Sequence, residues 1–226
     1  MRIITGEYKG RKLETPRGDD IRPTTDKVKE AIFNLLMHDV YDAVCVDLFT
    51  GTGNLGLEAL SRGARRCYFC DNARDSLNLA KTNIKKCQAS EKAIVLAGDY
   101  SKCLSRIREQ ADIFFLDPPY QAGLYENCLE RIDTLDLLSQ KGIIIAEHGA
   151  RDQMPERAGS LRKVRERRYG KIMVSIYRHA ETGGAEEAAD DEEALEAKRP
   201  AGAAEADVTA SCRAEGARAE GEGTEA

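Results

Sequence analysis

The sequence lacks long apolar runs. No stretch approaches the ~18 consecutive apolar residues that a membrane-spanning helix needs, and residues 1–6 do not lead into the apolar core of a signal peptide. We therefore expect neither membrane insertion nor export. The seven cysteines are an odd number scattered through apolar segments, and they lack the pattern of a disulfide framework. This usage favours reduced thiols and a cytoplasmic location.

The end of the chain is poor in apolar side chains. Glu181–Ala226 has no aromatic residue and only one Leu, one Val and one Cys. Such a composition does not bury enough apolar surface to offset the entropy of ordering, so we expect a disordered acidic tail over residues 180–226. Residues 1–179 carry 30 Lys and Arg against 25 Asp and Glu, whereas residues 180–226 carry 4 against 14. The net charge of −5 therefore combines a body of +5 with a tail of −10, and a basic body is compatible with an anionic partner such as nucleic acid.

The body alternates short apolar runs with amphipathic stretches, which is typical of a mostly parallel sheet flanked by helices. Its length allows one main domain, which we place at residues 21–179. We predict strands at Ala43–Leu48, Arg66–Cys70, Ala93–Ala97, Ile113–Leu116 and Gly142–Glu147. We predict helices at Leu55–Arg62, Arg74–Cys87, Ser101–Gln110 and Leu124–Ile132. Strands that are each followed by one helix indicate a doubly wound α/β fold.

Two segments fall outside this alternation. Residues 1–20 hold short β-prone runs around a glycine-containing turn, which predicts an N-terminal β-hairpin. A helix is expected to follow, capped by Thr24 or Thr25. Leu161–Arg178 has the pattern of two antiparallel strands joined at Tyr169-Gly170. With this terminal hairpin the predicted sheet has seven strands.

The most specific motif follows the first strand of the body. Gly51, Gly53 and Gly56 form a G-x-G-x-x-G pattern between a predicted strand and a predicted helix, and Asp71 lies at the end of the next strand. Glycines in this place let the backbone approach a ligand, helix N–H groups face that ligand, and the distal acid can bind a ribose diol. Incidental glycines in a tight turn are the alternative. Because strand, helix and acid all lie where a ligand site needs them, we interpret the segment as a nucleoside-cofactor site.

The glycine pattern alone does not separate NAD from S-adenosylmethionine. Asp47, four residues before Gly51, places a carboxylate at the mouth of the loop. A negative group there disfavours a pyrophosphate and suits the ammonium and sulfonium groups of S-adenosylmethionine. Asp99 follows the third strand and is placed to accept a hydrogen bond from an adenine amino group, although an acid there more often only forms a strand-end turn.

The fourth strand runs directly into Asp117-Pro118-Pro119-Tyr120. The two prolines stiffen the loop and remove two N–H donors. Asp117 and a backbone carbonyl can then accept hydrogen bonds from one exocyclic NH₂ group and hold its nitrogen toward a methyl donor, while Tyr120 stacks on the base. Asp117 can also take the proton that the nitrogen loses. A strand-terminating turn is the alternative, and the position beside the cofactor crevice favours the catalytic interpretation.

In this order the motifs resemble those of the S-adenosylmethionine-dependent amino-methyltransferases. Further segments resemble one branch, the ribosomal RNA small subunit methyltransferase D family: Arg2–Gly6, Gly10–Leu13, Arg22–Asp26 and Lys29–Leu36. The resemblance covers about residues 1–178 and leaves the tail out. It implies a seven-stranded, Rossmann-like class I methyltransferase fold. It also implies methyl transfer from S-adenosylmethionine to the N2 amine of a guanine in 16S rRNA, guanine 966, with the rRNA held in a small-subunit particle.

The resemblance further implies roles for individual residues. The target base would be held by Asp117, Pro118, Pro119 and Tyr120. The cofactor would be bound by Thr24, Asp47, Phe49, Gly51, Gly53, Asp71 and Asp99. Asp71 departs from the family, in which Glu is commoner at this position, but the shorter carboxylate still reaches a ribose diol.

Basic residues gather in two places. Arg157–Arg178 holds eight basic residues against the single acid Glu166, and residues 1–12 hold four against Glu7. Solvated hairpins explain any single one of these side chains, but the collective excess indicates phosphate binding. We therefore predict an RNA-binding set of Arg2, Lys9, Arg11, Lys12, Arg22, Arg165, Arg167 and Arg168.

Three alternatives stay open. A DNA or RNA adenine-N6 methyltransferase would use the same four-residue motif, although this chain has no large target-recognition domain. A NAD-dependent oxidoreductase shares the glycine loop but leaves that motif unexplained, and a non-catalytic RNA-binding protein would not need either motif intact. We predict no metal site, because the three His have no suitable spacing and Cys67 and Cys70 face opposite sides of a strand. We expect a monomer that binds no membrane.

Overall fold

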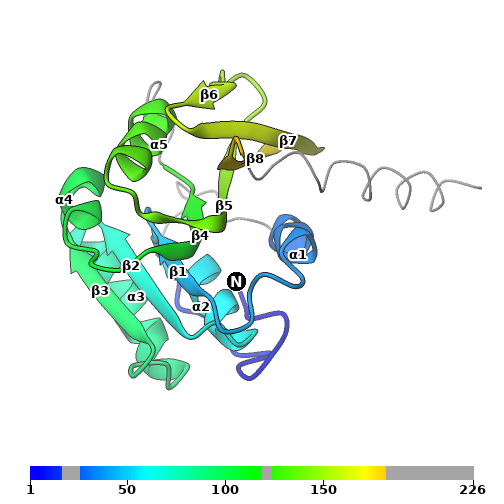
Figure 1. Ribbon diagram of the computed structural model, residues 1–226. Helices are drawn as coiled ribbons and strands as arrows, with labels where there is room; N and C mark the ends of the chain where they lie inside the picture. Colours follow the sequence, from blue (N-terminus) through cyan, green and yellow to red (C-terminus); the bar gives the residue numbers. More distant parts are fainter. Residues whose placement is uncertain (17–25, 119–123, 182–226) are drawn as a thin grey trace, which may run out of the picture. The chain divides into compact units, whose positions relative to one another are not determined.

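One sheet carries the fold, in the strand order β3-β2-β1-β4-β5-β8-β7-β6 (Figure 1). The protein is described by a computed structural model over residues 1–16, 26–118 and 124–181. The strands are β1 (Val44–Asp47), β2 (Arg66–Asp71), β3 (Ala93–Ala97), β4 (Ala111–Leu116), β5 (Leu138–Gly149), β6 (Arg157–Ala158), β7 (Leu161–Tyr169) and β8 (Ile172–His179). The helices are α1 (Asp26–Leu35), α2 (Asn54–Ser61), α3 (Arg74–Lys86), α4 (Tyr100–Leu104) and α5 (Leu124–Thr134). Arg22, Thr24, Pro119, Tyr120 and the predicted tail from residue 182 onward lie outside the described residues.

The pairing of the strands confirms the doubly wound, mostly parallel sheet. Strands β1 to β5 are joined by parallel ladders, and β8 and β7 continue the sheet as the antiparallel hairpin expected around Tyr169-Gly170. The described residues form eight strands instead of seven. The extra strand, β6, is two residues long and pairs with the start of β7. A strand this short shows no alternation of apolar and polar residues, so the sequence pattern did not indicate it.

Alternate residues of the central strands supply two apolar cores, one on each face of the sheet. Cys45 and Phe115 belong to the core that includes residues of α1, α2 and the end of α3, which we call the first core. Val46 and Phe114 belong to the second core, under α4 and α5. Cys67 lies in the first core and Cys70 in the second, as expected for strand positions three residues apart. Burial on both faces explains why these strands are near-continuous apolar runs.

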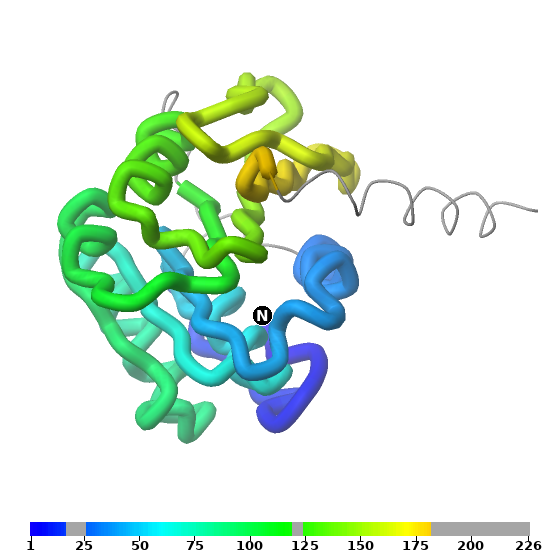
Figure 2. The backbone as a smooth tube through the Cα atoms, viewed as in Figure 1, coloured from blue at the N-terminus to red at the C-terminus, as the bar shows by residue number. Residues whose placement is uncertain are grey.

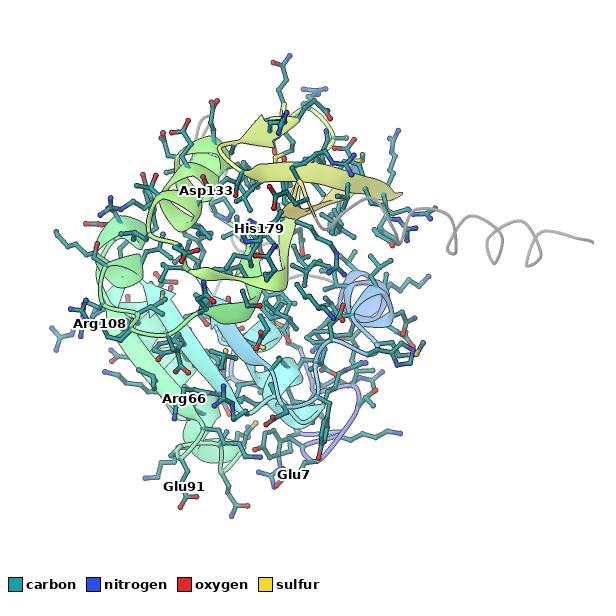
Figure 3. The ribbon with its side chains drawn as sticks, viewed as in Figure 1. Glu7, Arg66, Glu91, Arg108, Asp133 and His179 are labelled. Carbon is teal, nitrogen blue, oxygen red and sulfur yellow. The ribbon has the colours of Figure 1, made fainter. Side chains whose placement is uncertain are left out.

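Two boundaries differ from the sequence prediction by four residues or more, and the other predicted boundaries of the body's strands and helices lie within two. Helix α4 ends at Leu104 instead of Gln110. Glu109 accepts hydrogen bonds from the hydroxyl of Tyr68 at 2.7 Å and from Arg66, labelled in Figure 3, at 2.6 Å. This contact with β2 holds the segment after Leu104 out of the helix. Strand β5 begins at Leu138, which pairs with Ala111 across a register shift. The three residues after Leu138 are polar, so the sequence pattern did not predict this part of the strand.

The N-terminal segment, dark blue in Figure 2, lies against α2. Its two arms meet at one isolated antiparallel bridge, Arg2 with Lys12, and the N–H of Gly10 donates to the carbonyl of Ile3. The backbone N–H groups of Ile4 and Thr5 both donate to the carboxylate of Glu58 in α2, at 2.8 and 3.0 Å. The segment is therefore bonded to the helix that follows the glycine loop.

Candidate functional site

The carboxyl ends of the five parallel strands meet at one edge of the sheet, which we call the carboxyl edge. The chain runs from β1 through β2 to β3 and then returns to β4 on the other side of β1. The strand order therefore reverses between β1 and β4. Open α/β sheets bind ligands in the crevice at such a point, and the predicted cofactor and target-base residues follow β1, β2, β3 and β4 at this edge.

The glycine loop joins β1 to α2. Gly51 and Gly53 have φ angles of 51° and 81°, a region that favours glycine, and Gly53 is the residue that precedes α2. A Cβ atom on Gly51 would meet no atom within 4 Å, so the backbone here borders open space. Gly56 has a packing role instead. A Cβ atom there would lie 2.5 Å from the ring of Phe69 and 2.7 Å from the sulfur of Cys67, so glycine allows α2 to lie close to β2.

Asp47 ends β1 behind this loop and is only 3% exposed. Its carboxylate accepts hydrogen bonds from the hydroxyl of Thr50 and from the N–H of Gly56, both at 3.0 Å. Burial raises the pKa of Asp47 to about 6, although the bonds from Gly56 and Thr50 oppose the shift. The sequence placed this acid at the mouth of the loop. The structure places it behind the loop, where it holds the loop to the first turn of α2.

Asp71 ends β2 and is half-buried. One carboxylate oxygen accepts the N–H of Gly51 at 2.9 Å, and the other accepts the N–H of Ala73 at 2.8 Å. The twenty-residue spacing seen in the sequence is therefore a direct hydrogen bond in the fold. A carboxylate has about four lone-pair positions, so these two bonds leave room for a ribose hydroxyl.

Asp99 precedes α4 and caps it. One oxygen accepts the backbone N–H of Lys102 at 2.9 Å, and the other lies 3.1 Å from the ammonium group of the same residue. These interactions, the backbone bond first, lower the pKa of Asp99. The ring of Phe49, after β1, lies 6.4 Å from the ring of Tyr100, and both side chains are half-buried. Tyr100 was not predicted as a site residue, although an aromatic residue directly after a strand-end acid was a signal for it.

Asp117 and Pro118 follow β4, beside the glycine loop. Asp47 pairs with Phe115 in the β1–β4 ladder, two residues before Asp117. Asp117 is half-buried and Pro118 is buried. On the other side of β4, β5 carries Glu147 two residues before its end; this residue is 8% exposed and was not predicted as a site residue from the sequence. The sequence did contain a signal for Glu147, because this acid directly follows an apolar run, as Asp117 does.

The predicted RNA-binding residues do not form one surface. Among those in the described part of the chain, Arg2 pairs with Asp26 at 3.1 Å, and Arg11 donates to the carbonyl of Lys86 at 2.8 Å. Lys9 and Lys12 are exposed. In the β7–β8 ladder Arg165 and Arg167 are the partners of first-core residues, whereas Arg168 is the partner of Met173 and lies on the opposite face.

Arg168 lines a hollow of about 580 Å³ with Arg151 and Lys171, at the end of β5 and the β7–β8 turn. Gly149 pairs with Ile172, so this basic hollow lies at the carboxyl edge. A second hollow of about 390 Å³ lies at the opposite end of β1 and β2, next to the exposed side chains of Met37 and Tyr41. Residues 1–16, 26–118 and 124–181 contain no cluster of His, Cys, Asp and Glu that could hold a metal ion. No helix in those ranges is long and apolar enough to cross a membrane.

The strand order and the glycine loop define a Rossmann-like domain of the class I methyltransferase type. The chain belongs to the family described as "Conserved hypothetical protein 95", whose model matches residues 1–178, and this confirms the ribosomal RNA small subunit methyltransferase D family expected from the motifs. It is 39% identical to the "Putative rRNA methyltransferase YlbH" of Bacillus subtilis, over 79% of this chain and 98% of the relative. It is 32% identical to the ribosomal RNA small subunit methyltransferase D of Escherichia coli, over 81% and 92%.

Solved structures show the same architecture. The "Putative methyltransferase yhhF" of Escherichia coli superimposes with a TM-score of 0.71 at 32% sequence identity, covering 79% of this chain and 97% of that one. A conserved hypothetical protein of Streptococcus pyogenes superimposes with a TM-score of 0.64 at 26% identity, covering 68% and 96%. The described body of this chain therefore corresponds to nearly the full length of both proteins.

Proposed function

We propose that this chain transfers a methyl group from S-adenosylmethionine to the N2 amine of a guanine in the 16S rRNA of the small ribosomal subunit. The observation that carries the proposal is the position of Asp117-Pro118, at the end of β4 and directly beside the glycine loop of β1. The names of the relatives in Bacillus subtilis and Escherichia coli support rRNA as the substrate. The choice of guanine N2, and of guanine 966, rests on the family resemblance.

The residues of the crevice fit S-adenosylmethionine better than a dinucleotide. The N–H of Gly56, in the first turn of α2, already donates to Asp47 and is not left for a pyrophosphate. An ionised carboxylate at this place repels phosphate and attracts the ammonium and sulfonium groups of S-adenosylmethionine. Open space beside Gly51 admits the ligand, Asp71 can bind the ribose, and the paired rings of Phe49 and Tyr100 offer an apolar surface to adenine.

When bound, S-adenosylmethionine supplies an electrophilic methyl group. Asp117 and the carbonyl of Pro118 accept hydrogen bonds from the two N–H groups of the target amine, which turns the lone pair of the nitrogen toward that methyl group. Asp117 would take the proton that the nitrogen releases as the bond from nitrogen to the methyl carbon forms and the bond from that carbon to the cofactor's sulfur breaks, which leaves a neutral thioether. Tyr120, the proposed stacking residue, and Pro119 lie outside the described residues.

We assign RNA docking to the basic hollow and to the exposed side chain of Arg167. The hollow lies at the carboxyl edge, so phosphates bound there keep the RNA close to Asp117. Arg2 and Arg11 have partners within the protein, which makes them weaker candidates than the exposed Lys9 and Lys12. The acidic residues 182–226 are proposed to tune RNA binding by repulsion.

The proposal is tested with methyl-labelled S-adenosylmethionine and three acceptors in parallel: naked 16S rRNA, small ribosomal subunits and DNA. Nucleoside analysis of the products should find the label in N2-methylguanosine from one of the two rRNA acceptors. Label in N6-methyladenosine, or label only in DNA, would contradict the proposal.

Two variants accompany the assay. Asp117→Ala should abolish methyl transfer in single-turnover reactions at saturating RNA, while the affinities for S-adenosylmethionine and RNA stay close to wild type. Glu91→Ala is the matched control, because it removes an exposed carboxylate at the start of β3, away from the carboxyl edge (Figure 3). Its methylation rate should equal that of the wild type.

A further inference from the structure

Glu147 is a buried carboxylate to which the proposed mechanism gives no role. It lies in β5 opposite Val174 of β8, a residue of the first core, so its side chain is on the first-core face of the sheet. Asp47 follows Cys45 on this face of β1, and Asp117 is the first residue after β4. Each of three adjacent strands therefore has a carboxylate at or near its carboxyl end, and those of Glu147 and Asp47 are on one face.

The elements before and after the target-base motif, β4 and α5, both contact β5 near Glu147. Leu116 pairs with Ala146 in the β4–β5 ladder, so Asp117 and Glu147 are the next residues of two strands whose axes lie about 4.8 Å apart. After the motif, the hydroxyl of Tyr125 in α5 donates to the backbone carbonyl of Glu147 at 2.7 Å. A base held by Asp117 and Pro118 is consequently within reach of the Glu147 side chain.

We propose that Glu147 recognises the Watson–Crick edge of the target base by accepting a hydrogen bond from N1–H of guanine. This inference rests on the proposed function. Guanine carries a proton on N1 next to its N2 amine, whereas adenine carries an unprotonated N1 next to its N6 amine. Asp117 binds an amine that both bases possess. Glu147 discriminates between them, because its carboxylate would face the N1 lone pair of adenine without a proton between them.

The structure gives Glu147 the environment that such discrimination needs. The residue is only 8% exposed, so water does not replace the hydrogen bond from N1–H that the wrong base fails to donate. A site built to bind an N–H group rejects an analogue that lacks it far more strongly than a site that only measures shape. The bond from Tyr125 fixes the backbone from which the side chain extends.

The test uses 2-aminopurine, which keeps the 2-amine of guanine but has no proton on N1. Wild-type protein first methylates guanine RNA and the labelled nucleotide is located; this arm reports on the proposed function alone. The same RNA or particle is then assembled with 2-aminopurine at that position. The wild type should lose roughly 10- to 100-fold in kcat/KM on the 2-aminopurine substrate, the value of a hydrogen bond to a charged acceptor.

Glu147→Gln provides the decisive comparison, since the amide keeps the shape of the carboxylate and can turn its NH₂ group toward an unprotonated N1. We expect the guanine to 2-aminopurine preference of this variant to shrink to within about threefold, through slower guanine and faster 2-aminopurine methylation. Glu126→Gln, an exposed carboxylate in the first turn of α5, is the matched control and should keep the wild-type preference. Thermal unfolding and S-adenosylmethionine affinity are measured for all three proteins.

Two results would overturn the inference while the proposed function stands: equal wild-type rates on the two substrates, or an unchanged preference in Glu147→Gln. If Glu147→Gln unfolds at the assay temperature, the wild-type comparison of the two substrates still decides. Failure of the wild type on guanine RNA would instead count against the proposed function.

Discussion

Lys29→Met removes an ammonium group that lies wholly inside the protein, between α1 and α2. The three protons of Lys29 are each used: they go to the carbonyl of Arg2 at 2.6 Å, to the side-chain oxygen of Asn54 at 2.8 Å and to the carboxylate of Glu58 at 3.1 Å. Glu58 is equally buried and also accepts from Ile4, Thr5 and Arg62. The methionine would fill the space and leave three acceptors without this donor.

The loss of folding stability depends on the hydrogen-bond donors that Glu58 retains in the variant. Breaking a buried ion pair by removing one partner costs about 3–5 kcal/mol. Glu58 retains Arg62 at 3.0 Å and two backbone donors, so the low end, about 3 kcal/mol, applies. For a body of this size the midpoint of thermal unfolding should fall by roughly 6–12 °C. Lys27→Met, on an exposed position of the same helix, should change the unfolding free energy by less than about 0.5 kcal/mol.

Urea and thermal unfolding at pH 7 measure the effect, and Glu58→Gln completes a double-mutant cycle. Burial lowers the pKa of Lys29, and the charge of Glu58 is the largest opposing influence. Without that charge the folded pKa of Lys29 falls further below its unfolded value, so the unfolded state binds more protons between the two values. Stability of Glu58→Gln should therefore rise with pH in that window. The double variant should cost at least about 1 kcal/mol less than the two single costs added together. Strict additivity, or a Lys29→Met protein as stable as Lys27→Met, would refute the pairing.

Further expectations concern the loop, the hollow and the tail. Asp47→Asn should stabilise the protein by up to about 3 kcal/mol at pH 7, because a carboxyl with a raised pKa of about 6 makes its ionised form unfavourable in the fold. The gain should shrink as pH falls from 6 to 4 in urea titrations, and cofactor affinity should drop. Gly56→Ala should cost about 1–3 kcal/mol in thermal unfolding by pushing α2 from β2. Gly51→Ala should cost about 1 kcal/mol through its positive φ angle and should also weaken S-adenosylmethionine binding in calorimetry. Neutralising Arg151 and Lys171 should flatten the salt dependence of RNA binding, unlike neutralising Lys81 and Lys85 on α3; equal slopes would contradict docking at the hollow. Removing residues 182–226 should raise RNA affinity and leave the unfolding midpoint unchanged.

Periodicity was sufficient to predict the sheet because the parallel strands are buried on both faces. β2 and β3 were placed within one residue of their observed bounds, since β-branched and aromatic runs between amphipathic helices have few other interpretations. The early end of α4 could not be predicted in this way. It depends on Glu109 reaching Tyr68 and Arg66, a contact between residues about forty positions apart, and local propensity carries no information about it.

The candidate site was likewise predictable from the sequence in part. The spacing of Gly51 and Asp71 predicted that they belong to one crevice, and the structure joins them by a hydrogen bond of 2.9 Å. The direction of Asp47 could not be derived from spacing, because it depends on how α2 packs on the sheet. Arg165, Arg167 and Arg168 were grouped by charge, but neighbours in a strand point to opposite faces, so the group divides in the fold.

The N-terminal segment is part of the region that the family model matches, residues 1–178. The sequence analysis predicted a β-hairpin extension at residues 1–20, and in the structure Ile3, Tyr8 and Leu13 of this segment are buried in the first core. Polar positions of α2 hold the backbone of this segment: Glu58 binds Ile4, and Ser61 binds Tyr8 at 2.9 Å. The same helix begins at the glycine loop, whose Thr52 carbonyl accepts from Asn83, the residue that also binds both backbone groups of Glu14. A shift of the segment would consequently move the supports of the cofactor loop. The segment therefore need not contact RNA to matter for methyl transfer, because its backbone is bonded to the residues that support the cofactor loop.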